Sequence, residues 1–137
     1  MLGESVAMHE RLEAASRYLQ GASALVTAGD YAGAVSRCYY AAYQAMWAAL
    51  GHPMTKRRWE HTGIIQAFVR RRWDDSSYPT TGPGLYERFR FPLRRLYDIR
   101  LDVDYHVEPI TRETADWALE VVTNLIATIR TNVRERR

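Results

Sequence analysis

The segment between Asp30 and Gly51 constrains the fold more than any other part of the chain. Its apolar side chains recur every three to four residues, the period of an α-helix, over residues 31–50. One face carries Val35, Cys38, Ala42 and Met46, and another carries Tyr39, Tyr43, Trp47 and Leu50. A helix that is apolar on two sides is expected to lie centrally and to be packed by more than one neighbour.

Four further segments show the same period, each with a single apolar stripe. They cover about residues 4–27, 60–73, 85–103 and 112–134. No alternating strand pattern competes with them, and most connections are short. The sequence therefore predicts an all-α fold, an antiparallel bundle of about five helices, in a single domain over residues 1–137.

Glycine, proline and capping residues define the predicted helix ends. Gly29 ends the first helix, and Asp30 is placed to cap the second. Thr111 is placed to cap the last helix. Pro92 either bends the fourth helix or starts its regular part, and residues 74–84 (DDSSYPTTGPG) are the clearest loop in the chain.

Composition excludes several classes of protein. Cys38 is the only cysteine, so no disulfide can form within one chain, and its apolar helix face predicts a core position. The first residues contain no apolar run of signal-peptide length, and no segment approaches about 18 uncharged apolar residues. We therefore expect a cytoplasmic protein in a reducing compartment, without membrane contact.

Standard cofactor and metal motifs are absent, and a site built from carboxylates alone is the one way left to bind a metal. The sequence contains no P-loop, no GxGxxG and no HExxH, and one cysteine with four scattered histidines does not make a zinc site. No Glu-x-x-His pair supports a di-iron site. We predict neither a metal nor a cofactor.

Positive charge is concentrated in the middle of the chain. Residues 51–100 contain eleven of the 19 basic residues and five acidic ones, a local balance of +6 within a net charge of +3. All basic residues except Lys56 are arginines, whose planar forks suit phosphate groups. A coding preference for arginine explains the composition equally well, but the clustering favours an anionic partner. The basic residues that we single out as contacts for RNA phosphates are Lys56, Arg57, Arg58, Arg94 and Arg95.

Arg100 and His106 are the candidate catalytic pair. Arginine binds phosphate and stabilises charge that develops on it, and histidine moves protons near neutral pH, so together they can act on a phosphodiester without a metal. Six residues along an ideal helix turn about 240°, so the two side chains converge only if the helix ends between them or if a second subunit supplies one of them. The alternative is that Arg100 pairs with Asp104 four residues later and His106 lies on the surface.

Other polar residues have candidate supporting roles. Asp104 and Tyr105 would orient the pair, and His61 is either a second polar contributor or a contact at the start of the third helix. Arg37 lies on a very apolar helix and needs a partner or an exit to solvent. Its default interpretation is pairing with Asp98, Asp102 or Asp104, and ligand contact is the other option.

Three ordered elements carry a family resemblance. GDYAGAVSRCYYAAYQAMWAALG (residues 29–51) contains Arg-x-Tyr-Tyr-Ala, HTGIIQAF (residues 61–68) follows, and Arg100-x-x-x-Asp104-Tyr105 comes later. In these elements and in the closing helix from Thr111, the sequence resembles the HEPN superfamily, especially its small stand-alone prokaryotic branch. The resemblance covers nearly the whole chain.

The resemblance implies an antiparallel helical bundle that commonly dimerises. Many HEPN proteins are metal-independent ribonucleases whose signature is an arginine, four to six residues, then a histidine, with both subunits contributing to one cleft. Arg100 and His106 match this spacing with five residues between them. The implied function is an endoribonuclease homodimer, by analogy the toxin of a toxin–antitoxin pair with a nucleotidyltransferase. The alternatives are a non-catalytic module that binds nucleotide, RNA or a nucleotidyltransferase, and a helical adaptor with no nucleic-acid role.

Overall fold

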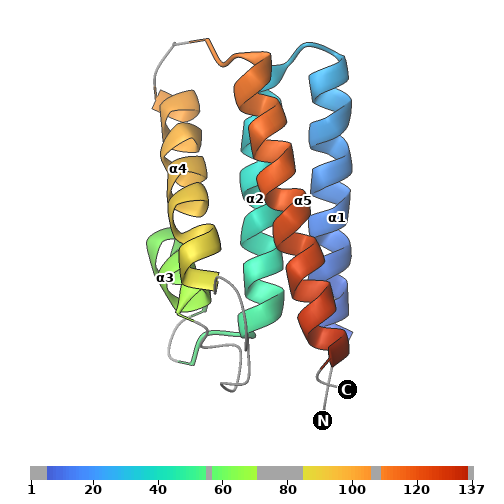
Figure 1. Ribbon diagram of the computed structural model, residues 1–137, viewed down its shortest axis with the longest axis vertical. Coiled ribbons are helices and arrows are strands. Elements are labelled where there is room, and N and C mark those ends of the chain that lie inside the picture. The colour runs from blue at the N-terminus through green and yellow to red at the C-terminus, as the bar shows by residue number, and fades with distance from the viewer. Residues whose placement is uncertain (1–5, 55–56, 71–84, 106–108, 136–137) are drawn as a thin grey trace.

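The protein folds into a bundle of α-helices, as the sequence predicts. The computed structural model describes residues 6–54, 57–70, 85–105 and 109–135. These residues form five helices: α1 (Val6–Thr27), α2 (Tyr31–Leu50), α3 (His61–Val69), α4 (Leu85–Tyr105) and α5 (Arg112–Glu135). The four long helices alternate in direction along the chain, and the short α3 lies beside the first half of α4 (Figure 1). The all-α prediction is confirmed.

Helix α2 is the centre of the bundle because it has two apolar faces. It contacts each of the other four helices. Cys38 and Met46 on one face and Tyr39 on the other are almost completely buried. The small alanine side chains of α2 let α1 approach it closely. The contact between α1 and α2 is the most extensive between any two helices in the described structure.

Local chemistry sets the helix ends. Asp30 caps α2, and its Oδ1 accepts a hydrogen bond from the Gly33 backbone N–H over 2.9 Å. Gly29 has a φ of 84°, which lets the chain reverse between α1 and α2 without a side-chain clash. Thr111 caps α5 through a bond from the Thr114 N–H over 3.2 Å. These caps confirm the predicted boundaries.

Two predicted boundaries are refined by the structure. Helix α3 ends at Val69, earlier than predicted, where the Arg70 N–H bonds to the Gln66 carbonyl. The remainder of the predicted third helix, residues 71–73, and the predicted loop at 74–84 lie outside the described residues. Pro92 lies inside α4, which continues on both sides of it. Proline lacks a backbone N–H, so α4 loses one internal hydrogen bond there without ending.

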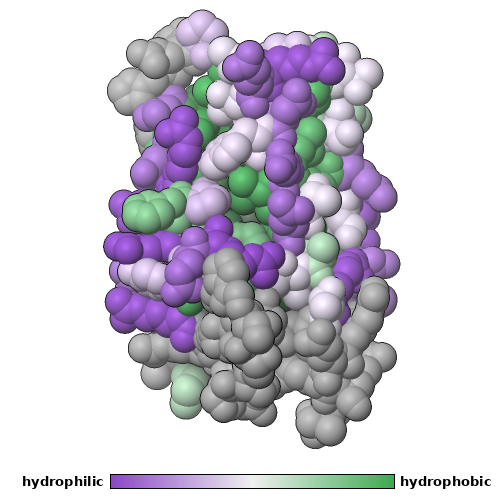
Figure 2. Space-filling model, viewed as in Figure 1, coloured by the Kyte–Doolittle hydropathy of each residue, from purple (hydrophilic) through white to green (hydrophobic). Residues whose placement is uncertain are grey.

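Helix α4 packs against α2 and α3 and only loosely against α5. A groove remains between α4 and α5, lined by Arg94, Arg95, Trp117 and the exposed Phe91. Figure 2 shows apolar surface on this side, flanked by hydrophilic side chains. None of the described helices combines the length and apolar character needed to cross a bilayer.

Candidate functional site

A cluster of aromatic rings lies where α2, α3 and α4 meet. Tyr39 at the middle of α2 is only 1% exposed. Its ring centroid lies 5.3 Å from that of His61, the first residue of α3, and 5.6 Å from that of Tyr97 on α4. The His61 ring also stacks on Tyr97, at 5.9 Å and an interplanar angle of 24°. Tyr43, one turn after Tyr39, closes the cluster at 5.0 Å from His61. One imidazole is therefore enclosed by three tyrosines.

Arg100 of α4 also contacts Tyr39. Its Cζ is 5.4 Å from the ring centroids of both Tyr39 and Tyr40. Its Nη2 donates a hydrogen bond to the Tyr40 hydroxyl over 2.9 Å, and its Nε lies 3.2 Å from Oδ2 of Asp104. The Arg100–Asp104 pairing that the sequence offered as an alternative is thus formed.

The Arg100 guanidinium is held in place, but not all of its N–H donors form hydrogen bonds. Its side chain is only 16% exposed. The Nε atom is buried and has no acceptor at hydrogen-bond geometry among the described residues, although Asp104 lies beside it as a counter-ion. A guanidinium has five N–H donors, so several remain for a bound anion. Cation–π contacts with two rings fix its orientation.

The protonation of His61 follows from its surroundings. Burial lowers its pKa, and the positive charges of Arg100 and Arg58 lower it further. Burial raises the pKa of Tyr39, so the Tyr39 hydroxyl keeps its proton. The Tyr39 hydroxyl and Nδ1 of His61 are 2.5 Å apart. A neutral imidazole forms this bond in either tautomer: Tyr39 donates to Nδ1 when the ring proton is on Nε2, and Nδ1–H donates to the phenol oxygen when it is not.

The described part of the basic connection before α3, residues 57–60, is fixed next to His61. Trp59 anchors it, because its Nε1 donates to the Gly51 carbonyl over 2.7 Å and its own carbonyl accepts a hydrogen bond from the Tyr43 hydroxyl. Arg58 is close enough to lower the pKa values of both His61 and Tyr43. The Arg57 and Arg58 side chains are exposed, and Lys56 lies outside the described residues.

The remaining predicted residues are dispersed. Arg94 and Arg95 line the α4–α5 groove, where Arg94 pairs with Asp98 and Arg95 lies over the Trp117 ring. Arg37 is exposed on α2, and no ion pair joins it to an aspartate of α4 within the described part of the chain. Its predicted pairing is not formed because it faces α1.

His106 is the other half of the candidate catalytic pair. His106 lies outside the described residues, as does the side chain of Tyr105. Within the residues that are described, no group of three or more His, Cys, Asp or Glu side chains could hold a metal ion.

Sequence reasoning missed the structural roles of Tyr39, Tyr40 and Tyr97. It treated the tyrosines mainly as core residues, whereas the Tyr40 hydroxyl holds Arg100 and the Tyr39 hydroxyl holds His61. The signal was present in the paired tyrosines of Arg-x-Tyr-Tyr-Ala. Adjacent positions on a helix point about 100° apart, so one pair can serve two neighbouring helices.

The comparisons with known proteins agree with this architecture. No curated protein matches the sequence. The family model described as "HEPN domain" matches residues 8–132, which include all five helices except the ends of α1 and α5. The chain belongs to the HEPN domain family.

Proposed function

We propose that this protein is a metal-independent endoribonuclease whose site is built around Arg100. The observation that supports this most is the guanidinium itself, oriented by two tyrosine rings and Asp104, with N–H donors left on its Nη atoms and a neutral imidazole that shares the Tyr39 ring as a neighbour. Such a guanidinium can bind a phosphate and stabilise the negative charge that builds up on it. Family membership agrees, since the HEPN domain points to ribonucleases and nucleotide-related modules.

In the proposed reaction the ribose 2′-hydroxyl attacks the adjacent phosphorus atom. A bond forms between O2′ and phosphorus, and the bond from phosphorus to the 5′ oxygen of the next nucleotide breaks. The products are a 2′,3′-cyclic phosphate and a 5′-hydroxyl. His106 would take the proton from the attacking hydroxyl or give one to the leaving oxygen, and Arg100 would hold the non-bridging oxygens.

His61 is suited to a different task from His106. We assign its proton to Nε2, with Nδ1 accepting from the Tyr39 hydroxyl, so that Nε2 can donate to a phosphate oxygen. Its lowered pKa keeps it neutral, which makes it a hydrogen-bond donor rather than a charged acid. Arg58 would add positive potential at the same place, and Asp104 and Tyr105 would orient Arg100 and His106.

The proposal includes the assembly. HEPN domains often dimerise and bind RNA, and a twofold axis would bring two Arg100 side chains to one cleft. By analogy the protein would be a toxin controlled by a nucleotidyltransferase partner. Sedimentation at micromolar concentration should show a dimer. A monomer with full cleavage activity would contradict the shared cleft.

Cleavage of labelled RNA in EDTA tests the enzyme. We expect wild type to cleave, and Arg100→Ala and His106→Ala each to reduce the rate by about 10²-fold or more. Arg100→Lys should not restore activity, because an ammonium does not reproduce the planar fork. Arg112→Ala is the matched control, since Arg112 is an exposed arginine on α5 that pairs with Asp116 at i+4. Cleavage unchanged in both Arg100→Ala and His106→Ala would reject the site.

A second candidate function is a non-catalytic module that binds RNA or nucleotide. It is favoured because the groups proposed for catalysis already have partners within the protein. Arg100 is bonded to Tyr40 and paired with Asp104, and Nδ1 of His61 is bonded to Tyr39. The same experiment separates the two. Salt-dependent RNA binding by wild type without any cleavage would select the binding module.

A further inference from the structure

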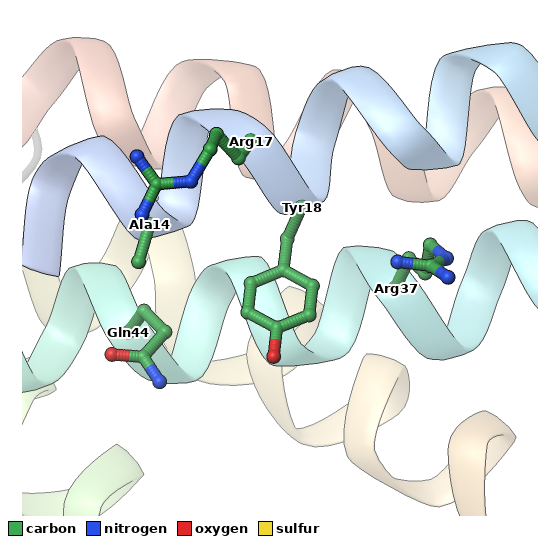
Figure 3. Close-up of a pocket in the computed structure, with 5 residues that line it drawn as sticks. All are labelled: Ala14, Arg17, Tyr18, Arg37 and Gln44. Carbon is green, nitrogen blue, oxygen red and sulfur yellow. The ribbon is translucent and has the colours of Figure 1, made fainter.

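A second groove lies between α1 and α2, on the face where Arg37 is found. It has a volume of about 360 Å³ and is lined by Ala14, Arg17 and Tyr18 of α1 and by Arg37 and Gln44 of α2. Figure 3 shows the Tyr18 ring reaching from α1 across α2. Arg37 lies to one side of this ring along α2, and Gln44 and the Arg17 guanidinium lie to the other. An aromatic ring is thus flanked by two guanidinium groups.

Neither guanidinium is neutralised. Arg17 and Arg37 are both exposed, and within the described residues neither forms an ion pair. Four arginines elsewhere in the bundle have an acidic neighbour: Arg94 with Asp98, Arg100 with Asp104, Arg112 with Asp116 and Arg130 with Glu13. Two unpaired like charges lining one groove raise its positive potential, which attracts an anionic ligand.

The position of Arg37 depends on Gly21, in the second half of α1. A Cβ at Gly21 would lie 3.2 Å from Cδ of Arg37 and 3.5 Å from its Nη1. Glycine lowers the stability of a helix interior, and here it leaves room for the Arg37 side chain to lie along α1. The groove therefore holds Arg37 in place by packing, although the guanidinium itself stays accessible.

Gln44 is also oriented. Its Oε1 accepts a hydrogen bond from Nη1 of Arg11 over 2.8 Å, and Arg11 is fixed in turn 3.6 Å over the Trp47 ring. With the oxygen engaged, the amide N–H₂ remains as a donor on the side of the Tyr18 ring (Figure 3). It can meet the acceptor atoms on the edge of a base.

Two contacts link this groove to the Arg100 site. The Tyr18 ring lies 6.0 Å from Tyr40, and the Tyr40 hydroxyl accepts the hydrogen bond from Arg100. A path of rings and guanidinium groups thus runs from Arg17 through Tyr18 and Tyr40 to Arg100. Alternation of stacking rings with arginines is how proteins hold single-stranded nucleic acid, because each unpaired base can stack and each phosphate can meet a cation.

We propose that the α1–α2 groove binds single-stranded RNA next to the Arg100 site, with a base stacked on Tyr18 and phosphates held by Arg17 and Arg37. The inference deepens the proposed ribonuclease function and rests on it for the identity of the ligand as RNA. It assigns the groove to the part of the strand beside the bond that is cut. Duplex RNA should bind less well, because its bases are already stacked on each other and cannot lie on Tyr18.

The test is binding of a labelled 2′-O-methyl RNA oligonucleotide, followed by fluorescence anisotropy. This probe lacks the attacking hydroxyl, so binding is measured without cleavage. We expect Arg17→Ala/Arg37→Ala to weaken binding about tenfold or more and to reduce the slope of log affinity against log salt by about 1.4, or two single-strand phosphate contacts. Tyr18→Ala should weaken binding by about tenfold, whereas Tyr18→Phe keeps the ring and the affinity.

Matched controls make the result specific. Arg90→Ala/Arg112→Ala removes two exposed arginines from α4 and α5, so it loses the same charge without touching the groove. Affinity equal in the two double variants would overturn the proposal. Circular dichroism should show that both double variants remain folded, as expected for exposed side chains. A competition experiment with AMP adds a second control. If AMP displaced the probe as well as the unlabelled oligonucleotide does at the same concentration of nucleotides, the groove would bind a free nucleotide and not a strand, and the proposal would be overturned.

Failure of the groove and failure of the nuclease give different results. Groove-dependent binding of the 2′-O-methyl probe, with no cleavage of natural RNA by wild type, supports the groove and rejects the nuclease. Cleavage that depends on Arg100, with probe binding unaffected by Arg17→Ala/Arg37→Ala, supports the nuclease and rejects the groove. A dimer that becomes monomeric in Arg17→Ala/Arg37→Ala, with unchanged probe binding, would assign the groove to a second copy and overturn the RNA proposal.

Discussion

Arg100 and Tyr40 are 60 positions apart in the chain and are joined by one hydrogen bond of 2.9 Å, from the guanidinium Nη2 to the phenol oxygen. The bond ties α4 to α2 at the point where the proposed catalytic site meets the α1–α2 groove. Tyr40 therefore has two neighbours of different kinds, the Arg100 guanidinium and the Tyr18 ring.

Replacing Tyr40 with phenylalanine should loosen Arg100 without unfolding the protein. The variant keeps the ring contacts but removes the acceptor, and Tyr40 is 37% exposed, so we expect a stability loss of about 0.5–1 kcal/mol. The rate of RNA cleavage should fall by more than the small loss of stability can explain. The fall should be mainly in kcat, because Arg100 loses its orientation. Urea unfolding and steady-state kinetics measure the two effects. Tyr86→Phe is the control, since Tyr86 is exposed and no hydrogen bond of its hydroxyl is found among the described residues; an equal kinetic loss there would contradict the role of Tyr40.

The stability of the fold should decrease in mild acid because of His61. Its pKa in the folded state is lowered from 6.5 by burial and by two arginines. Between the two pKa values the unfolded chain binds a proton that the folded chain does not, so stability is complete above about pH 6.5 and is lost as the pH falls through the folded pKa. Urea unfolding at a series of pH values measures this.

Two variants test whether His61 causes this pH dependence of stability. His61→Gln should be less stable at neutral pH, since Tyr39 loses its hydrogen bond with Nδ1 and the ring contacts, and should show a weaker pH dependence below 6.5. His52→Gln removes an exposed histidine and should leave the dependence intact. If His52→Gln flattened the curve and His61→Gln did not, the assignment would be wrong.

Cys38 should be unreactive in the native protein. It is completely buried on α2, and burial raises its pKa to about 12, so almost no thiolate forms near neutral pH. A thiol-specific chromogenic reagent should react only when urea unfolds the chain. Ser23→Cys, with a second cysteine at an exposed position of α1, should react with one equivalent at once. Rapid reaction of the wild-type protein would contradict the core position.

The Asp30 cap should be worth about 1 kcal/mol. Asp30→Ala removes the acceptor of the Gly33 N–H, whereas Asp30→Asn keeps an oxygen there and should cost little. Gly33→Ala should be destabilising as well, because its Cβ would lie 2.4 Å from Oδ2 of Asp30. Thermal unfolding of the three variants measures the effect, and an Asp30→Asn variant as unstable as Asp30→Ala would reject the capping role.

Gly21→Ala should separate stability from RNA binding. Alanine favours the helix by up to about 1 kcal/mol, but the new Cβ at 3.2 Å from Cδ of Arg37 displaces that side chain. We expect equal or higher thermal stability together with weaker binding of the 2′-O-methyl RNA probe. Gly63→Ala is the control, because a Cβ there meets nothing within 4 Å. A Gly21→Ala variant that binds as wild type does would show that the position of Arg37 is unimportant.

The sequence by itself determined the helices, their order and the centre of the bundle. Helix formation and helix ends depend on contacts between residues that are close in the sequence. The apolar period, the Asp30 cap and the glycines at helix ends can therefore be recognised from the sequence alone. The Arg100–Asp104 ion pair was also predictable from the sequence, since residues four apart on a helix are neighbours. The end of α3 was misplaced because the arginines that follow Val69 are good helix formers, and propensity alone does not show where packing stops.

Only the tertiary structure decided which polar side chains meet. His61, Tyr39, Tyr40 and Arg100 come from three helices, and their contacts depend on the rotation of each helix about its own axis. Periodicity gives the apolar face of a helix but not which neighbour each polar residue reaches. Arg37 illustrates this, since the sequence suggested an aspartate of α4 as its partner, whereas packing against Gly21 places it over α1. The physical reason is that close packing fixes the relative positions of the helices, and no local signal encodes that arrangement.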